Sequence, residues 1–291
     1  MKKFLILAVI LLPIVILLAV GVAYVTGYEV IRDVRYGDRE YEVMDVFIPD
    51  EAYRRETNGC VIVIHGGSWM HGDKTEEEPS ARFIANSGYI TASINYKLFE
   101  VGDEYNVGEV LDEIDMAIIA VADLVAERGI TLDSVATYGY SAGAHLAMLY
   151  AYTRGESAPL DVRFVANLAG PADLDYDIWG RDTAIDIGRI LTGDRITDEM
   201  TDSGEVDSLL DEFSPVNHVK CDTPPTVMAY GGKDTTVPKE NGDSLEKMLS
   251  EAGVRYDYVL LPDSDHTMVL NFDKRLKFLG LIVEYCEEYF N

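Results

Sequence analysis

Basic side chains are scarce in this chain. Lys and Arg together number 24 against 51 acidic residues, which gives a formal net charge of −27 over 291 residues. A protein that binds nucleic acid needs a basic face to neutralise phosphates. The sequence contains no basic patch, so we expect no nucleic acid partner. The same acidity favours solubility and repels anionic polymers.

Cysteine is scarce as well. The chain has three cysteines, Cys60, Cys221 and Cys286, which lie far apart and form no CxxC pair. This odd number and wide spacing signal neither a zinc site nor a disulfide framework. We therefore expect no bound metal and interpret the three as isolated buried thiols. A single disulfide stays open as an alternative.

Charge is absent from the chain between Lys3 and Glu29, and residues 4–25 are almost entirely apolar. About 20 apolar residues span a bilayer as a helix, whereas a cleaved signal peptide has a shorter apolar region of roughly 7–15 residues. The length favours an uncleaved membrane anchor in residues 1–27. Residues 21–23 offer a small-x-small cleavage site, so a signal peptide is the alternative.

The charges before this apolar segment predict the side of the membrane on which the rest of the chain lies. Lys2 and Lys3 precede the segment, and positive flanks tend to stay in the cytoplasm. We therefore expect residues 28–291 to form an extracytoplasmic domain. It would be tethered to the membrane by the N-terminal helix, or secreted if the leader is cleaved.

Residues 28–291 alternate between short β-rich runs and amphipathic stretches, without an internal repeat. Such alternation predicts an α/β domain with a mostly parallel sheet covered by helices on both faces. The first two strands, joined by Gly37-Asp38, predict an antiparallel hairpin at one edge. The expected strands are 28–36, 40–48, 61–64, 89–95, 134–138, 163–168, 224–230 and 256–261, and the expected helices are 79–87, 110–125, 142–152, 240–252 and 273–290.

Residues 171–213 interrupt the alternation. This stretch is acidic, has weak periodicity and carries Trp179. A connection of this length between two core strands is usually a lid or cap. We therefore expect a cap insertion here.

Gly139-Tyr140-Ser141-Ala142-Gly143 is a G-x-S-x-G sequence between an expected strand and an expected helix. In this context it predicts a nucleophile elbow, a tight turn that lifts the serine hydroxyl above the sheet edge. Ser141 is therefore the candidate nucleophile. His145 lies one turn further along the helix and is expected to pack or hydrogen bond behind the elbow.

A serine hydroxyl is a weak nucleophile and needs a base. In chains with this elbow the order is serine, acid, histidine. Asp234 follows an expected strand at the carboxyl edge of the sheet, and His266 is the only histidine beyond it. Elimination therefore selects His266 as the base. Asp234 is the preferred acid for its position after a strand, with Asp263 and Asp265 as alternatives close to the base in sequence.

A glycine-rich loop, HGGSW, follows the strand expected at 61–64. Acyl transfer builds negative charge on the carbonyl oxygen, and backbone N–H groups must stabilise it. Ala142 supplies one donor, and Gly67 is the first choice for the second, with Gly66 or Ser68 as a further contributor. Trp69 either lines the pocket or packs structurally.

These motifs together resemble those of a known group of enzymes, the hormone-sensitive-lipase-like and feruloyl-esterase-like (BD-FAE-like) carboxylesterases of the α/β-hydrolase superfamily. The resemblance covers the chain from about residue 40 to its end. It implies hydrolysis of a small-molecule carboxylic ester without a cofactor, with catalytic roles at Ser141, Asp234 and His266. The matching segments, in order, are HGGSW with GDK, INYKL, GYSAGAHLA, SPVNH, GGKDTTVP and SDH.

Some features of the sequence do not decide which type of bond is cleaved. Ser68 stands where hormone-sensitive-lipase-like members often have a third glycine, and HGG-x-W is closer to the feruloyl-esterase-like branch and to kynurenine formamidases. An amidase of the formamidase type is therefore the alternative. A serine peptidase fits less well, because such peptidases usually have a glycine where this chain has Ala144. A non-catalytic binding protein on the same fold would usually lack a triad residue.

Overall fold

A mostly parallel sheet organises the part of the chain that the computed structural model describes, which is residues 27–290 without 101–105, 194–195, 198–199 and 201–203. The sheet has eight strands in the order β1-β2-β4-β3-β5-β6-β7-β8. β2 runs antiparallel to β1 and β4, and the other pairings are parallel. The strands are β1 (Tyr28–Arg35), β2 (Val43–Pro49), β3 (Asn58–Ile64), β4 (Ile90–Ile94), β5 (Leu132–Tyr140), β6 (Asp161–Leu168), β7 (Thr226–Gly231) and β8 (Tyr256–Leu261).

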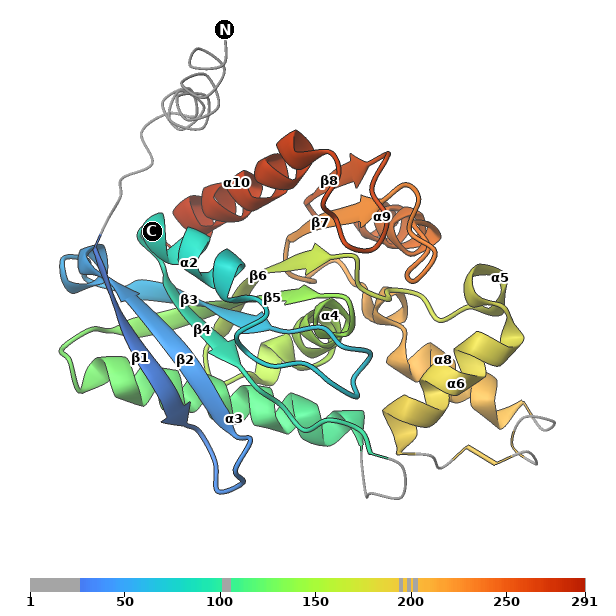
Figure 1. Ribbon diagram of the computed structural model, residues 1–291, viewed down its shortest axis with the longest axis horizontal. Helices are drawn as coiled ribbons and strands as arrows, with labels where there is room; N and C mark the ends of the chain where they lie inside the picture. Colours follow the sequence, from blue (N-terminus) through green and yellow to red (C-terminus); the bar gives the residue numbers. More distant parts are fainter. Residues whose placement is uncertain (1–26, 101–105, 194–195, 198–199, 201–203, 291) are drawn as a thin grey trace, which may run out of the picture.

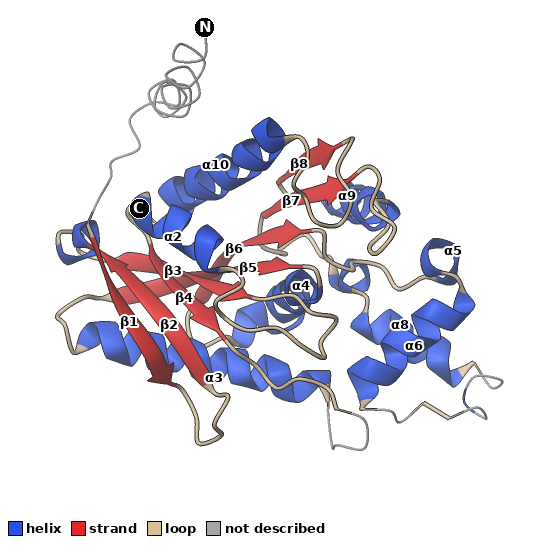
Figure 2. Ribbon diagram, viewed as in Figure 1, coloured by secondary structure: helices blue, strands red, loops and turns tan. Residues whose placement is uncertain are grey.

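Helices cover both faces of this sheet, as the sequence pattern predicts (Figures 1 and 2). α2 and α10 pack on one face, and α3, α4 and α9 pack on the other. The expected strands and these five expected helices are all present, and the α/β-hydrolase fold is confirmed. The helices are α2 (Glu78–Asn86), α3 (Val107–Ala126), α4 (Ala142–Arg154), α9 (Glu240–Ala252) and α10 (Phe272–Tyr289).

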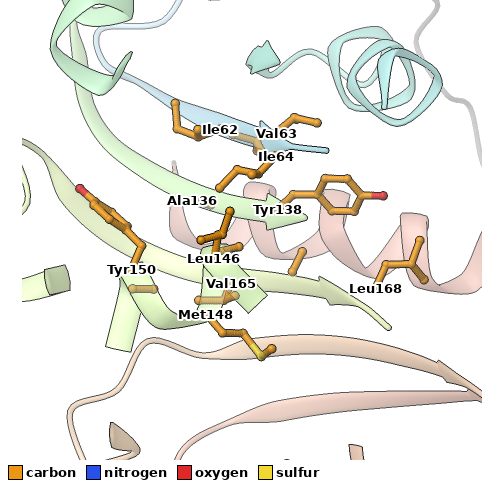
Figure 3. Close-up of a cluster of buried hydrophobic side chains, with 14 of the residues drawn as sticks. Ile62, Val63, Ile64, Ala136, Tyr138, Leu146, Met148, Tyr150, Val165 and Leu168 are labelled. Carbon is orange, nitrogen blue, oxygen red and sulfur yellow. The ribbon is translucent and has the colours of Figure 1, made fainter. Parts of the chain in front are cut away.

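The core lies between the sheet and these two helical layers. β3 is an uninterrupted buried run, because its neighbours β4 and β5 and the helices leave neither face in solvent. Figure 3 shows side chains of β3, β5 and β6 together with Leu146 and Met148 of α4. On the face of the sheet opposite α4, Phe164 of β6 packs against Tyr285 of α10 with ring centroids 5.6 Å apart.

The register of the central strands brings their carboxyl ends to one edge. Ile64, at the end of β3, pairs with Ile94 of β4 and with Gly139 of β5. The HGGSW loop and the elbow therefore leave the sheet side by side. Further along, Gly231 at the end of β7 pairs with Leu261 at the end of β8, so the loops that follow these two strands are also neighbours.

The insertion between β6 and β7 contains helices α5 (Tyr176–Trp179), α6 (Arg181–Thr192) and α8 (Glu205–Phe213). The sequence predicts a cap insertion here but no particular helix, because the periodicity of this acidic stretch is weak. α6 nevertheless buries Ala184, Ile187, Gly188 and Leu191 along one stripe against α8. Figure 1 places the three helices beyond the ends toward which β5 and β6 point.

The three cysteines are all free thiols. Cys60 and Cys286 are buried, as expected, whereas Cys221 is exposed. The expectation of a buried thiol is therefore wrong for Cys221, which lies in a surface turn before β7.

The predicted N-terminal anchor lies outside the described residues, since the description begins at residue 27. Within the described part, no helix is both long enough and apolar enough to span a bilayer.

Candidate active site

Ser141 occupies the turn between β5 and α4 with a strained backbone, φ 54° and ψ −122°. The two flanking glycines make this turn sterically feasible. A methyl group at Gly139 would lie 2.2 Å from the carbonyl carbon of Gly143, and one at Gly143 would lie 2.1 Å from the carbonyl oxygen of Ile64. No side chain fits at either distance. The backbone therefore presents the Ser141 hydroxyl at the sheet edge, as an elbow does.

The structure brings together Ser141, His266 and Asp234, which are far apart in the chain. His266 Nε2 lies 2.9 Å from Ser141 Oγ, and His266 Nδ1 lies 2.7 Å from Asp234 Oδ2. Both distances are those of good hydrogen bonds. With the imidazole proton on Nδ1, the ring donates to Asp234 and accepts from the Ser141 hydroxyl.

Asp234 is fixed in a closed turn after β7. Its second carboxylate oxygen, Oδ1, accepts the N–H groups of Thr236 at 2.8 Å and Val237 at 2.9 Å. The side chain has no exposed surface. The neighbouring Lys233 donates its N–H to the carbonyl of Ser264 at 2.9 Å. This bond joins the turn that carries the acid to the loop that carries His266.

The two alternative acids point elsewhere. Asp263 pairs with Lys233 Nζ at 3.0 Å and accepts from the side chain of Asn271. Asp265 accepts the N–H and the hydroxyl of Thr267. Both carboxylates lie on the surface, and their hydrogen bonds to these partners lower their pKa values. Of these three carboxylates, only Asp234 lies within hydrogen-bond distance of the imidazole of His266.

The HGGSW loop lies against the nucleophile. A methyl group at Gly66 would come within 3.3 Å of Ser141 Cβ. Gly67 has φ +109°, and a methyl group there would lie only 1.8 Å from the carbonyl oxygen of His71. Gly67 thus requires glycine, whereas a side chain at Gly66 would fit tightly against Tyr140 and Ser141. Among the described residues, the N–H groups of Gly67 and Ala142 donate to no backbone acceptor, so these groups can meet an oxyanion at Ser141.

Polar contacts with other segments of the domain hold this loop in place. Tyr96 donates to the carbonyl of His65 at 3.0 Å and stacks on its imidazole with centroids 4.4 Å apart. Burial lowers the pKa of His65. Further along the loop, Lys74 Nζ pairs with Asp45 of β2 at 2.8 Å and with Asp33 at 2.9 Å.

His145 lies behind the elbow and is fully buried. Its Nε2 is 2.9 Å from the carbonyl oxygen of Phe213, at the end of the insertion. The Trp69 indole approaches its imidazole edge-on with centroids 5.2 Å apart. Trp69 is itself buried, so the structure favours packing over lining an open pocket. Within the described residues, His145 Nδ1 and Trp69 Nε1 have no hydrogen-bond partner.

The two ends of the insertion are tied to the domain. The buried side chain of Asn241 accepts the N–H groups of Ala172 and Asp173 at the first end. At the second end, the carbonyl of Phe213 is bonded to His145 of α4, and Ser214 accepts the N–H of Leu174 at 2.9 Å, which joins the two ends. The insertion is thus fixed at its base, next to the sheet edge that carries Ser141.

Several residues that shape this site are not predicted from the sequence. Tyr140, Asn241 and Lys74 hold its loops through contacts between distant segments. Tyr140 lies in the GYSAGAHLA segment and Lys74 in the GDK segment of the family resemblance, but no local pattern indicates these contacts, and Asn241 lies in no matching segment. Among the described residues, no group of His, Cys, Asp and Glu has the arrangement of a metal site.

A profile of the BD-FAE family matches residues 44–249, which is most of the chain. The probable isoprenylcysteine alpha-carbonyl methylesterase ICME of Oryza sativa subsp. japonica is 25% identical over 273 residues, covering 86% of this chain and 61% of its own length. The probable carboxylic ester hydrolase LipM of Mycobacterium tuberculosis is 26% identical over 267 residues, covering 87% and 59%. The chain therefore spans less than two thirds of these relatives.

Solved structures share the fold at low sequence identity. A truncated carbohydrate esterase from gut microbiota has a TM-score of 0.74 at 18% identity and covers 91% of this chain and 97% of its own. Esterase B of Lactobacillus rhamnosis, in a structure with a tributyrin phosphonate, has a TM-score of 0.70 at 21% identity and covers 91% and 87%.

Proposed function

The chain belongs to the BD-FAE family of α/β-hydrolases, and we propose that it is a serine hydrolase that cleaves carboxylic esters through an acyl-enzyme intermediate. The observation that carries this proposal is the hydrogen-bonded sequence Ser141–His266–Asp234 at a strained elbow. The names of the relatives, which describe esterases and ester hydrolases, support the choice of the ester bond.

In the first half of the reaction, Ser141 Oγ attacks the ester carbonyl while His266 Nε2 takes its proton. The carbonyl oxygen becomes an oxyanion, which the N–H groups of Ala142 and Gly67 stabilise, with Gly66 or Ser68 as a further donor. The tetrahedral intermediate collapses as His266 returns the proton to the leaving alcohol. Asp234 stabilises the imidazolium while it exists.

In the second half, water attacks the acyl group on Ser141 and His266 again takes a proton. The second tetrahedral intermediate expels Ser141, which regains its proton from His266, and the product is a carboxylic acid. The strongly acidic domain repels this product once it ionises, and it disfavours anionic substrates for the same reason. We therefore propose uncharged small-molecule esters as the substrate class.

The insertion at 171–213 is the proposed wall of the substrate pocket. Its bonds to Asn241 and His145 fix its ends near the elbow. Side chains carried by α5, α6 and α8 would then limit the acyl or alcohol group. A series of esters of graded chain length measures this limit.

The test compares the full-length wild type with Ser141→Ala on p-nitrophenyl esters of graded length, N-formylkynurenine and peptide amides. We expect ester hydrolysis by the wild type and only background hydrolysis by Ser141→Ala, since the residual catalysis comes from binding and the oxyanion donors alone. Faster turnover of the formamide than of any ester would replace the esterase proposal with the amidase. Turnover of no compound would indicate a binding protein.

A further inference from the structure

Tyr140, the variable residue of the elbow, contacts the loop that carries the base. It is the last residue of β5, directly before Ser141. Its hydroxyl donates to the carbonyl oxygen of His266 at 2.6 Å. Its ring also stacks on the imidazole of His266, with centroids 5.2 Å apart and planes inclined by 27°.

Apart from the bond between Lys233 and Ser264, the loop around His266 has few attachments to the sheet. Ser264 donates its hydroxyl to Leu270, and Met268 donates its N–H to Asp265, so these two bonds stay inside the loop. Asp234 holds one nitrogen of the His266 ring, and the Ser141 hydroxyl holds the other. Contacts at the two nitrogens leave the ring free to tilt about the line that joins them, whereas a further contact at the backbone of the same residue and a stacked ring fix the ring plane.

Tyr140 remains able to donate over the working pH range. Burial, together with the carboxylates of Glu77, Asp234 and Asp265 and against the opposing effect of Arg275, raises the pKa of its phenol to about 12. The hydroxyl therefore stays protonated at any pH well below 12, and it can donate in every step of the proposed cycle.

We propose that Tyr140 is a positioning residue for the base: its hydrogen bond to the His266 carbonyl and its stacked ring hold the imidazole where Nε2 reaches Ser141 Oγ. Because Tyr140 is the last residue of β5 and directly precedes Ser141, one rigid element sets the positions of both the nucleophile and the base. The inference rests on the proposed function, in which His266 is the general base.

The first test removes only the hydroxyl, with Tyr140→Phe in the full-length protein. The lost hydrogen bond should lower kcat roughly three- to thirty-fold, while KM stays within about twofold, since Tyr140 acts on the base. Tyr140→Leu, which also removes the stacked ring, should lower kcat further. Tyr150→Phe is the matched control, because it deletes a hydroxyl on α4 that is bonded to Asp115 of α3 at 2.6 Å, and it should keep the wild-type kcat.

A double-mutant cycle separates positioning of the base from a general structural role. In a His266→Ala background, Tyr140→Phe should leave the residual rate unchanged, because the group it positions is gone. An equal fold-loss in both backgrounds would show that Tyr140 acts elsewhere and would overturn the inference. An unchanged kcat in Tyr140→Phe itself would overturn it as well.

A spectroscopic measurement needs no substrate and so separates this inference from the proposed function. The proton between His266 Nδ1 and Asp234 gives a downfield NMR resonance, assigned by its loss in His266→Ala. In Tyr140→Phe we expect this proton to exchange with water at least about threefold faster, and in Tyr150→Phe we expect no change. Equal exchange in Tyr140→Phe and wild type contradicts the positioning role, whether or not any ester is hydrolysed.

Discussion

Asp234 binds His266 Nδ1 with one carboxylate oxygen at 2.7 Å and two backbone N–H groups with the other. The Asp234 carboxylate is thus itself held in place by the backbone while it binds the imidazole of His266. Asp234→Asn keeps this shape but favours the wrong imidazole tautomer, and we expect kcat to fall by about three to four orders of magnitude with little change in thermal unfolding. The measurement is steady-state kinetics with circular dichroism on the same samples.

Asp263→Asn and Asp265→Asn are the matched controls for this prediction. Both carboxylates are exposed and bind other partners, so each change should alter kcat by no more than a few-fold. Loss of activity in either control, together with retained activity in Asp234→Asn, would assign the acid to the His266 loop instead.

Replacing a glycine by alanine should have opposite effects on stability at Gly143 of the elbow and at Gly280 of α10. Gly143→Ala forces a methyl group to 2.1 Å from the Ile64 carbonyl, and overpacking at such a distance costs about 1–3 kcal/mol or more. Gly280→Ala in α10 meets no atom within 4 Å and should stabilise the helix by about 0.5–1 kcal/mol. Chemical denaturation measures both. Equal stability of the two variants would show that the close approach at Gly143 is not a constraint.

The sequence predicts the order of strands and helices, and the strand-turn-helix context of the G-x-S-x-G sequence predicts the elbow. The chain order of serine, acid and histidine leaves His266 as the one candidate for the base. The sequence favours Asp234 for its position after a strand but leaves Asp263 and Asp265 open, since these two also lie in a loop that follows a strand. Only the folded chain shows which carboxylate reaches Nδ1. The helices of the insertion and the contact from Tyr140 depend equally on packing between distant segments.

The buried pair of Lys74 and Asp45 predicts a large stability effect. Lys74 Nζ lies 2.8 Å from Asp45, and both side chains are almost fully buried. Lys74→Met leaves a buried carboxylate without this partner, which costs about 3–5 kcal/mol, although Arg32 still contacts Asp45. The exposed pair of Arg54 and Glu51 is the control: Arg54→Met should change the free energy of unfolding by less than about 1 kcal/mol. A similar cost at both sites contradicts the account of this anchor.

His145 predicts a loss of stability in mild acid. Burial lowers its pKa from 6.5 to about 4, against the opposing effect of its bond to Phe213. The unfolded chain therefore binds a proton more readily than the folded one between these values. Stability should fall as the pH drops from about 6.5 toward 4, by about 3 kcal/mol from this group alone.

The variant His145→Gln isolates this contribution, since it keeps an N–H donor and does not titrate. Urea denaturation at several pH values should show a flatter dependence for His145→Gln than for wild type. His71→Asn, which removes an exposed histidine, should keep the wild-type slope. If His145→Gln and wild type lose stability in parallel, protonation of His145 does not drive the loss.

The covalent intermediate tests the central claim most directly. The full-length protein is mixed with p-nitrophenyl acetate, quenched in acid within the first turnovers, digested and analysed by mass spectrometry. The account predicts an acetyl group on the peptide that contains Ser141, its absence in Ser141→Ala, and a larger fraction acetylated in Asp234→Asn if deacylation slows more than acylation. Ester hydrolysis without acetylation of Ser141, or with the acetyl group on another residue, would contradict the account.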